Sequence, residues 1–166
     1  MSDAVTEVGA VVASQLGRPP RGLRGVAHRC PCGLPDVVVT APRLEDGSPF
    51  PTLFYLTCPR AAAALSRLES AGVMREMEQR LGTDPGLRAA QQAAHRDYLA
   101  RRDAAAAADG LEPLPPGTQS AGGMPDRVKC LHALAAHELA VPGGNPLGRE
   151  AVDAAEEWWS RGRCVP

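Results

Sequence analysis

Aromatic side chains and lysine are scarce in this sequence of 166 residues. It contains two Phe, two Tyr and two Trp, and Lys129 is the only lysine among eighteen Lys and Arg side chains. Single-stranded nucleic acid is usually bound on aromatic platforms, and a formal net charge of −1 supplies no positive excess to attract phosphates. We therefore expect no nucleic acid among the partners of this protein.

Long apolar runs are also missing. No stretch approaches the roughly 18 consecutive apolar residues that a membrane helix requires, and the first seven residues are acidic where a signal peptide would be basic. We expect no membrane partner and a cytoplasmic location. The 44% of hydrophobic residues and the length fit one domain with a core of its own.

The apolar pattern predicts a single α+β domain over residues 1–166. Helical spacing predicts a helix over 3–16, and three short runs of β-forming residues, 26–29, 36–40 and 52–57, predict a small antiparallel sheet of about three strands. Four to six helices are expected in all, the later ones at 61–71, 73–81, 85–108, 125–140 and 146–158. The glycines and prolines of residues 109–123 predict a flexible loop, and we expect residues 159–166 to form a C-terminal tail.

The five cysteines indicate where function is to be sought. In a reducing compartment they are metal ligands, reactive thiols or buried apolar groups more often than disulfides. Each of Cys30, Cys32, Cys58, Cys130 and Cys164 lies at or near the end of a predicted element, and Cys58 occupies a helix cap, where the helix dipole favours a thiolate. Zinc or an iron–sulfur cluster is the leading hypothesis; buried inert thiols and a redox thiol pair stay open as alternatives.

Lys129 and His132 are candidate catalytic residues. Both fall in the helix predicted from residue 125, three residues apart on one face, next to Cys130. The one lysine of an arginine-rich chain indicates that a compact, titratable ammonium group is wanted there. The alternative for His132 is an ordinary surface or hydrogen-bonded histidine.

Basic residues indicate a small anionic ligand. Arginine binds phosphate and carboxylate bidentately, and backbone amides at the start of a helix face any anion that lies there. Four arginines precede the Cys-Pro-Cys turn, at positions 18, 21, 24 and 29, and a glycine pair precedes the helix predicted from residue 125. A solvated basic face is the alternative. The candidate binding residues are Arg29, Arg127, Gly122 and Gly123.

Several motifs, taken in order, resemble one family. They are Arg29-Cys-Pro-x-Gly, the segment PFPTLFYLTCP at 49–59, LExxGxMREM at 68–77, GGMPDRVKCLH at 122–132 and Asn145-Pro-x-Gly. In this combination the chain resembles the actinobacterial domain of unknown function 501 over nearly its whole length. The resemblance implies no particular reaction, since a family does not settle chemistry.

The resemblance does sharpen two expectations. The family pattern keeps Cys30, Cys58, Cys130 and Cys164 and lets position 32 vary, which implies a metal site of these four thiolates. Genes of the family typically lie beside those for enolase, a septum-formation initiator and an exopolyphosphatase. This implies the alternative function, a non-enzymatic interaction or regulatory protein with partners in cell division or polyphosphate metabolism.

Overall fold

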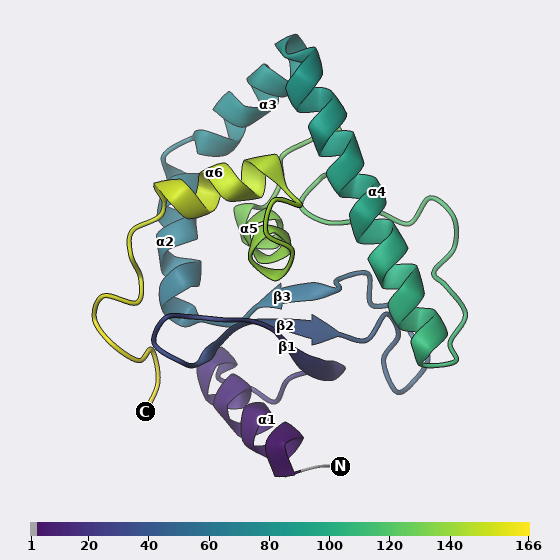
Figure 1. Cartoon of the computed structure of the whole chain (residues 1–166), viewed down its shortest axis with the longest axis vertical. Helices are drawn as coiled ribbons and strands as arrows, with labels where there is room; N and C mark the ends of the chain where they lie inside the picture. Colours follow the sequence, from purple (N-terminus) through teal and green to yellow (C-terminus); the bar gives the residue numbers. More distant parts are fainter. Residues whose placement is uncertain (1–2) are drawn as a thin grey trace.

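Three antiparallel strands form the sheet around which the helices are arranged (Figure 1). The strands are β1 (Leu23–Arg29), β2 (Pro35–Thr40) and β3 (Phe54–Leu56), and β2 lies between the other two. Val38 of β2 is opposite Val26 on one side and Tyr55 on the other. This computed structural model describes residues 3–166, and it confirms the α+β class and the three-stranded sheet.

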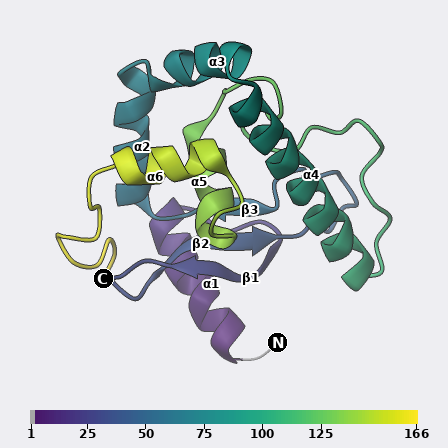
Figure 2. The same cartoon turned by 45° about the horizontal axis from the view of Figure 1, so that its top comes forward.

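The helices cover both faces of the sheet. One face carries α1 and the other carries α5, which the remaining helices enclose (Figures 1 and 2). Within residues 3–166, no helix has both the length and the apolar character needed to cross a bilayer. The six helices described are α1 (Asp3–Leu16), α2 (Pro59–Ser70), α3 (Val73–Thr83), α4 (Pro85–Ala108), α5 (Leu131–Ala140) and α6 (Pro146–Ala154).

Three of these helices begin in the same way, with a capping side chain followed by proline. Proline suits the first helical position because the N–H that it lacks would have no partner there. Asp84 accepts a hydrogen bond from the Leu87 amide at 3.0 Å at the start of α4, and Asn145 accepts one from the Gly148 amide at 2.8 Å at the start of α6. Cys58 caps α2, as its position before a proline predicts.

The helix expected over residues 125–140 begins only at Leu131, and that prediction was wrong at its start. Residues 121–129 instead form turns in which the Lys129 amide donates to the Gly122 carbonyl at 2.7 Å. Gly122 has a φ of +61°, and a Cβ there would lie 2.8 Å from a methyl group of Leu134. Packing of this glycine against α5 therefore prevents an earlier helix start. The last helix likewise ends at Ala154, short of the predicted residue 158.

The core lies between the sheet and α5, and polar side chains of α4 and α5 are part of it. Tyr98 and His137 are both fully buried, and Phe54 contacts both rings. The Tyr98 hydroxyl accepts hydrogen bonds from the backbone amides of Leu53 (2.6 Å) and Phe54 (3.4 Å). Tyr98 thus ties α4 to the start of β3.

The segment between α4 and α5 has no helix or strand, in keeping with the loop expected over residues 109–123. The buried Arg102 fastens this segment to α4, because its guanidinium group donates to the Gln119 carbonyl at 2.7 Å. The same group donates to the Pro51 carbonyl, ahead of β3, at 3.0 Å. Flexibility of the loop stays a prediction.

The two tyrosines of the chain provide a matched test of the buried hydroxyl group. Tyr98→Phe leaves the buried Leu53 amide without its acceptor and should lower the free energy of unfolding by about 1–3 kcal/mol. Tyr55→Phe, at a half-buried side chain, should change it by less than about 0.5 kcal/mol. Urea denaturation measures both, and equal effects of the two substitutions would contradict the role given to Tyr98.

Candidate functional site

One carboxylate joins the end of α2 to the start of α5. The Glu69 side chain accepts a hydrogen bond from the Leu131 amide at 2.8 Å, and the same oxygen lies 3.1 Å from Nδ1 of His132. An amide in the first turn of a helix has no partner within the helix and needs one from elsewhere. Glu69 therefore fixes both the position of the α5 N-terminus and the orientation of the His132 ring.

The hydrogen-bond partners of His132 favour a ring that is protonated on both nitrogens. Nδ1 faces the Glu69 carboxylate, and Nε2 lies 3.0 Å from the carbonyl oxygen of Ala62, with the Ser66 hydroxyl at 3.2 Å. Carboxylate and carbonyl oxygens only accept hydrogen bonds, so a proton on each nitrogen satisfies both contacts. These partners favour the imidazolium form, in keeping with a pKa raised to about 9.

His137 shows the opposite pattern. Its Nε2 faces the Asp97 carboxylate at 3.0 Å, but its Nδ1 faces the amide NH₂ group of Asn145 at 3.2 Å. A neutral ring with one donor and one acceptor satisfies this arrangement. Burial also lowers the pKa of His137, although Asp97 opposes this effect. Of the two histidines of α5, only His132 has surroundings that favour the charged form.

Cys130 lies at the N-cap position of α5, next to this charged ring. Burial acts to raise the pKa of the Cys130 thiol, but the adjacent His132 ring and the Ala133 amide together bring the pKa below its usual value of 9.0. The hydrogen bond to Cys130 is the largest cause that raises the pKa of His132, to about 9, and Glu69 adds to it while burial opposes it. Both shifts favour a thiolate–imidazolium pair.

The pair opens on a cavity of about 540 Å³. Cys130 and His132 form one wall of this cavity, and β3 together with the ends of α1 and α2 forms the rest. A ligand in the cavity could therefore reach the half-buried sulfur. The lining residues are Gln15, Leu16, Thr52, Phe54, Tyr55, Leu56, Thr57, Pro59, Ala62, Cys130, His132 and Ala133.

Glu69, Cys130 and His132 each place one potential ligand atom within 4.8 Å of the others, a spacing at which they could share a divalent ion. A histidine nitrogen must lose its proton before it binds a metal. Both nitrogens of His132 already face acceptors, so metal binding would break one of these hydrogen bonds. The arrangement suits the thiolate–imidazolium pair better than a metal ion.

The other four cysteines gather in a separate cluster. Cys30 and Cys58 are buried there against Trp158, with Cys32 and Cys164 packed on them at the edge. The strands β1 and β3 run in the same direction on either side of β2, so their carboxyl ends bring Cys30 and Cys58 to one end of the sheet. The two strands are not neighbours, because β2 lies between them.

The predicted set of four thiolates is thus only partly brought together. Cys30, Cys58 and Cys164 share the cluster, Cys32 joins them, and Cys130 lies with Glu69 and His132 instead. In residues 3–166, no three of the clustered sulfur atoms lie within 4.8 Å of one another. Thiolates on one zinc ion are about 3.8 Å apart, given Zn–S bonds of about 2.3 Å.

The clustered thiols are in a different protonation state from Cys130. Burial raises the pKa of Cys30 to about 12 and that of Cys58 to about 11. The thiol of Cys58 does cap α2, with the Ala61 amide 3.5 Å from its sulfur. The expectation that this cap favours a thiolate was wrong, because desolvation outweighs the hydrogen bonds from the helix amides.

The remaining predicted residues lie away from this site. Lys129 is exposed and precedes α5, so it does not share a helix face with His132 as predicted. Arg29 donates to the Gly33 carbonyl of its own turn at 3.1 Å, and Arg127 is paired with Glu78. Gly122 and Gly123 do not precede a helix directly, so the helix N-terminus expected to bind an anion there is absent from the described residues around them.

Sequence reasoning missed Glu69. It is 63 positions from His132, and although it belongs to the LExxGxMREM motif at 68–77, nothing in that motif points to a contact with His132. Only the packing of α2 against α5 gives this residue its role.

The fold and site define a small α+β protein in which a cysteine and a histidine line a cavity and a glutamate behind them holds the histidine. The family model described as "Protein of unknown function (DUF501)" matches residues 26–153, and the chain belongs to this family. The match covers Glu69, Cys130 and His132 and leaves Cys164 outside it. No curated protein and no solved structure matches the chain.

The five thiols should react with iodoacetamide at very different rates. At pH 7 the thiolate is the reacting form, so Cys130, with its lowered pKa, should be alkylated first, while Cys30 and Cys58 stay protonated and unreactive. His132→Gln removes the imidazolium charge and should raise the pKa of Cys130, so that its alkylation at pH 7 becomes slower. Peptide mass spectrometry gives the rate at each site.

The reactivity of Cys130 should fall at a lower pH than that of an ordinary thiol, because its pKa lies below the usual value. Ser66→Ala is the matched control, since the Ala62 carbonyl remains to hold Nε2. Alkylation of Cys130 no faster than that of Cys58 would contradict this description of the site.

Proposed function

We propose that the protein is a thiol-dependent enzyme of the acyl-transfer class, in which Cys130 is the nucleophile, His132 moves the proton and Glu69 is the positioning residue. The observation that carries the proposal is that Cys130 and His132 line the cavity while Glu69, outside its lining, holds the His132 ring and the start of α5. A nucleophile beside a base that a third group orients is the arrangement common to covalent catalysts.

The reaction follows from the protonation states. The Cys130 sulfur attacks the carbonyl carbon of an ester or thioester, a carbon–sulfur bond forms, and the bond to the leaving group breaks. The His132 imidazolium donates its proton to the leaving group and becomes neutral. In the second half, neutral His132 takes a proton from water as the oxygen attacks the acyl-cysteine, which releases the acid and restores the thiolate and the imidazolium.

Two features favour acyl transfer over disulfide exchange. Disulfide chemistry within one chain needs a second thiol next to the first, and the other four cysteines form the separate cluster described above. The negative oxygen of a tetrahedral intermediate needs hydrogen-bond donors. The positive end of the α5 dipole lies beside Cys130 and favours a negative charge there.

The experiment uses 4-nitrophenyl acetate as the acyl donor. Wild-type protein should release nitrophenolate and carry one acetyl group, mapped to Cys130 by mass spectrometry. Cys130→Ser should abolish this adduct, and His132→Gln should slow turnover by about 10²-fold or more, the usual contribution of acid–base catalysis. His95→Gln, at a histidine that contacts Ser120 and lies outside the site, should have no effect.

Circular dichroism establishes that each variant is folded. Nitrophenolate release that is as fast in Cys130→Ser, or acetylation confined to other cysteines, would overturn the proposal. If added zinc protects Cys130 from acetylation at one equivalent, the three side chains hold a metal ion instead of acting as a nucleophile and its base.

A second candidate function is the binding of a thiophilic metal, zinc or an iron–sulfur cluster, by Cys30, Cys32, Cys58 and Cys164. The observation that favours it is the convergence of four thiols from three distant segments in one largely buried cluster. The donor set is all sulfur, which suits both zinc and iron–sulfur clusters. A bound metal would displace the protons that burial now holds on Cys30 and Cys58.

Metal analysis of protein purified without oxygen separates these cases. Wild-type protein should contain one equivalent of zinc, or iron with sulfide and a brown colour. Cys58→Ser should lose this metal, and Cys130→Ser should retain it. Retention in Cys58→Ser together with loss in Cys130→Ser would place the metal at Glu69, Cys130 and His132. Folded protein without stoichiometric metal would overturn this candidate.

A further inference from the structure

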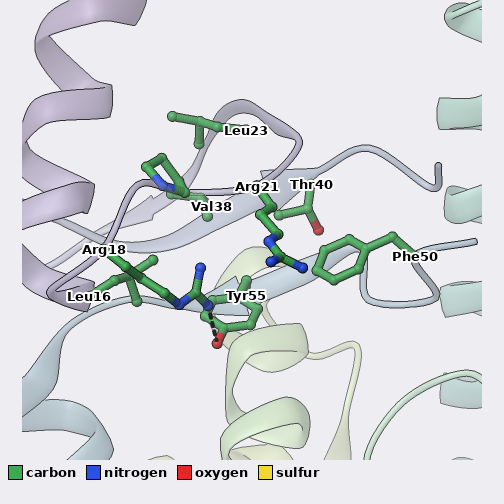
Figure 3. A pocket seen from close by; sticks show the side chains of 9 residues that line it. Leu16, Arg18, Arg21, Leu23, Val38, Thr40, Phe50 and Tyr55 are labelled. Atoms are coloured by element: carbon green, nitrogen blue, oxygen red, sulfur yellow. Dashed lines mark hydrogen bonds between the residues drawn. The ribbon is translucent and has the colours of Figure 1, made fainter. Parts of the chain in front are cut away.

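A second cavity adjoins the one at Cys130. It has a volume of about 380 Å³ and lies between the end of α1, the following turn and the sheet (Figure 3). Leu16 and Tyr55 line both cavities, so the two meet at these side chains. A ligand that occupies the second cavity could extend past them toward Cys130.

Two arginines lie on the wall of this second cavity. Figure 3 shows the guanidinium groups of Arg18 and Arg21 at the same cavity, Arg18 beside Tyr55 and Arg21 beside Phe50. Arg18 donates only weakly, to the Tyr55 hydroxyl at 3.4 Å and to the Pro19 carbonyl at 3.3 Å.

Neither arginine is neutralised by a carboxylate. Among the described residues, no Asp or Glu oxygen lies within 4.0 Å of either guanidinium group, although six other arginines have such partners. The pKa of Asp46 is lowered, mainly by the hydrogen bonds from Ser48. The positive charge of Arg21 makes a smaller contribution to the same effect. Two positive charges at one cavity therefore remain available to a ligand.

The other walls are mainly apolar. Leu23 and Val38 of the sheet, together with Phe50 and Leu16, supply most of the remaining lining. Arginine binds carboxylate and phosphate groups through paired N–H donors, while apolar walls bind hydrocarbon. The cavity is thus suited to a ligand that combines an anionic group with an apolar chain.

We infer that Arg18 and Arg21 form a subsite for the anionic end of an amphipathic substrate, a carboxylate or a phosphate ester, whose apolar part lies in the second cavity. This inference rests on the proposed function in one respect, that the reactive end of the substrate reaches Cys130. It names the substrate class of that site: an acyl donor that carries a negative charge at a distance from its reactive carbonyl.

The first experiment measures binding alone and needs no reaction. Calorimetry compares octyl phosphate, octanoate, inorganic phosphate and octanol on the wild-type protein. Octyl phosphate or octanoate should bind at least tenfold more tightly than inorganic phosphate or octanol, since only the first two use both the arginines and the apolar walls. The stronger of the two identifies the anion as phosphate or carboxylate.

The paired variant Arg18→Gln/Arg21→Gln should weaken that binding at least tenfold. The matched control is Arg75→Gln/Arg88→Gln, which removes the same charge from exposed positions on α3 and α4 and should leave binding unchanged. Equal weakening by both pairs, or inorganic phosphate that binds as tightly as octyl phosphate, would overturn the subsite.

The second experiment tests the connection to Cys130. The acetylation of Cys130 by 4-nitrophenyl acetate is repeated with saturating octyl phosphate, which should slow it severalfold in wild type and have no effect in the paired arginine variant. Binding without any effect on Cys130 would overturn the connection and leave an isolated anion site. Absence of acetylation with intact binding would refute the proposed function and not the subsite.

Discussion

The contact between the Glu69 carboxylate and the start of α5 sets the geometry of everything that can react in this protein. A helix N-terminus needs partners for its free amides, and here the partner comes from another helix and carries a charge. That charge also holds the His132 ring, and the ring in turn holds the Cys130 sulfur. One acidic side chain thus positions a helix, orients a cation and, through the cation, stabilises a thiolate.

The two histidines of α5 lie in different surroundings. At its start, His132 faces only acceptors and is charged; one and a half turns later, His137 faces one donor and one acceptor and is neutral within the core. The cysteines divide in a similar way. Cys130 lies beside a cation at a helix N-terminus, whereas Cys30 and Cys58 lie among apolar side chains that keep them protonated. Environment rather than residue type assigns their chemistry.

Local signals in the sequence were enough for much of the fold. The apolar spacing over residues 3–16 and the caps before Pro85 and Pro146 predicted helices that the structure confirms. The start of α5 was not predictable in this way, since Pro125 and Asp126 look like the first residues of a helix. The close approach of Gly122 to Leu134 decides the matter, and this contact exists only after α5 has packed.

The candidate site was accessible to sequence reasoning only in part. Cys130 and His132 lie two positions apart and could be singled out from their residue types. Their partner Glu69 could not, because only the packing of α2 on α5 brings it to them. The prediction that Cys130 lies with the other cysteines failed for the same reason. The ends of β1 and β3 bring Cys30 and Cys58 into one cluster, whereas Cys130 lies beside Glu69 and His132.

The protonation state of His132 is the most direct test of this arrangement. Long-range ¹H–¹⁵N NMR spectra of the histidine rings distinguish an imidazolium ion from either neutral tautomer, and His137 serves as the neutral reference in the same sample. At pH 7.5, between the usual histidine pKa of about 6.5 and the value of about 9 for His132, both ring nitrogens of His132 should carry protons. In Cys130→Ser the ring should lose its proton at a lower pH than in wild type. A neutral His132 ring in the wild-type protein at this pH would contradict the thiolate–imidazolium pair and the function built on it.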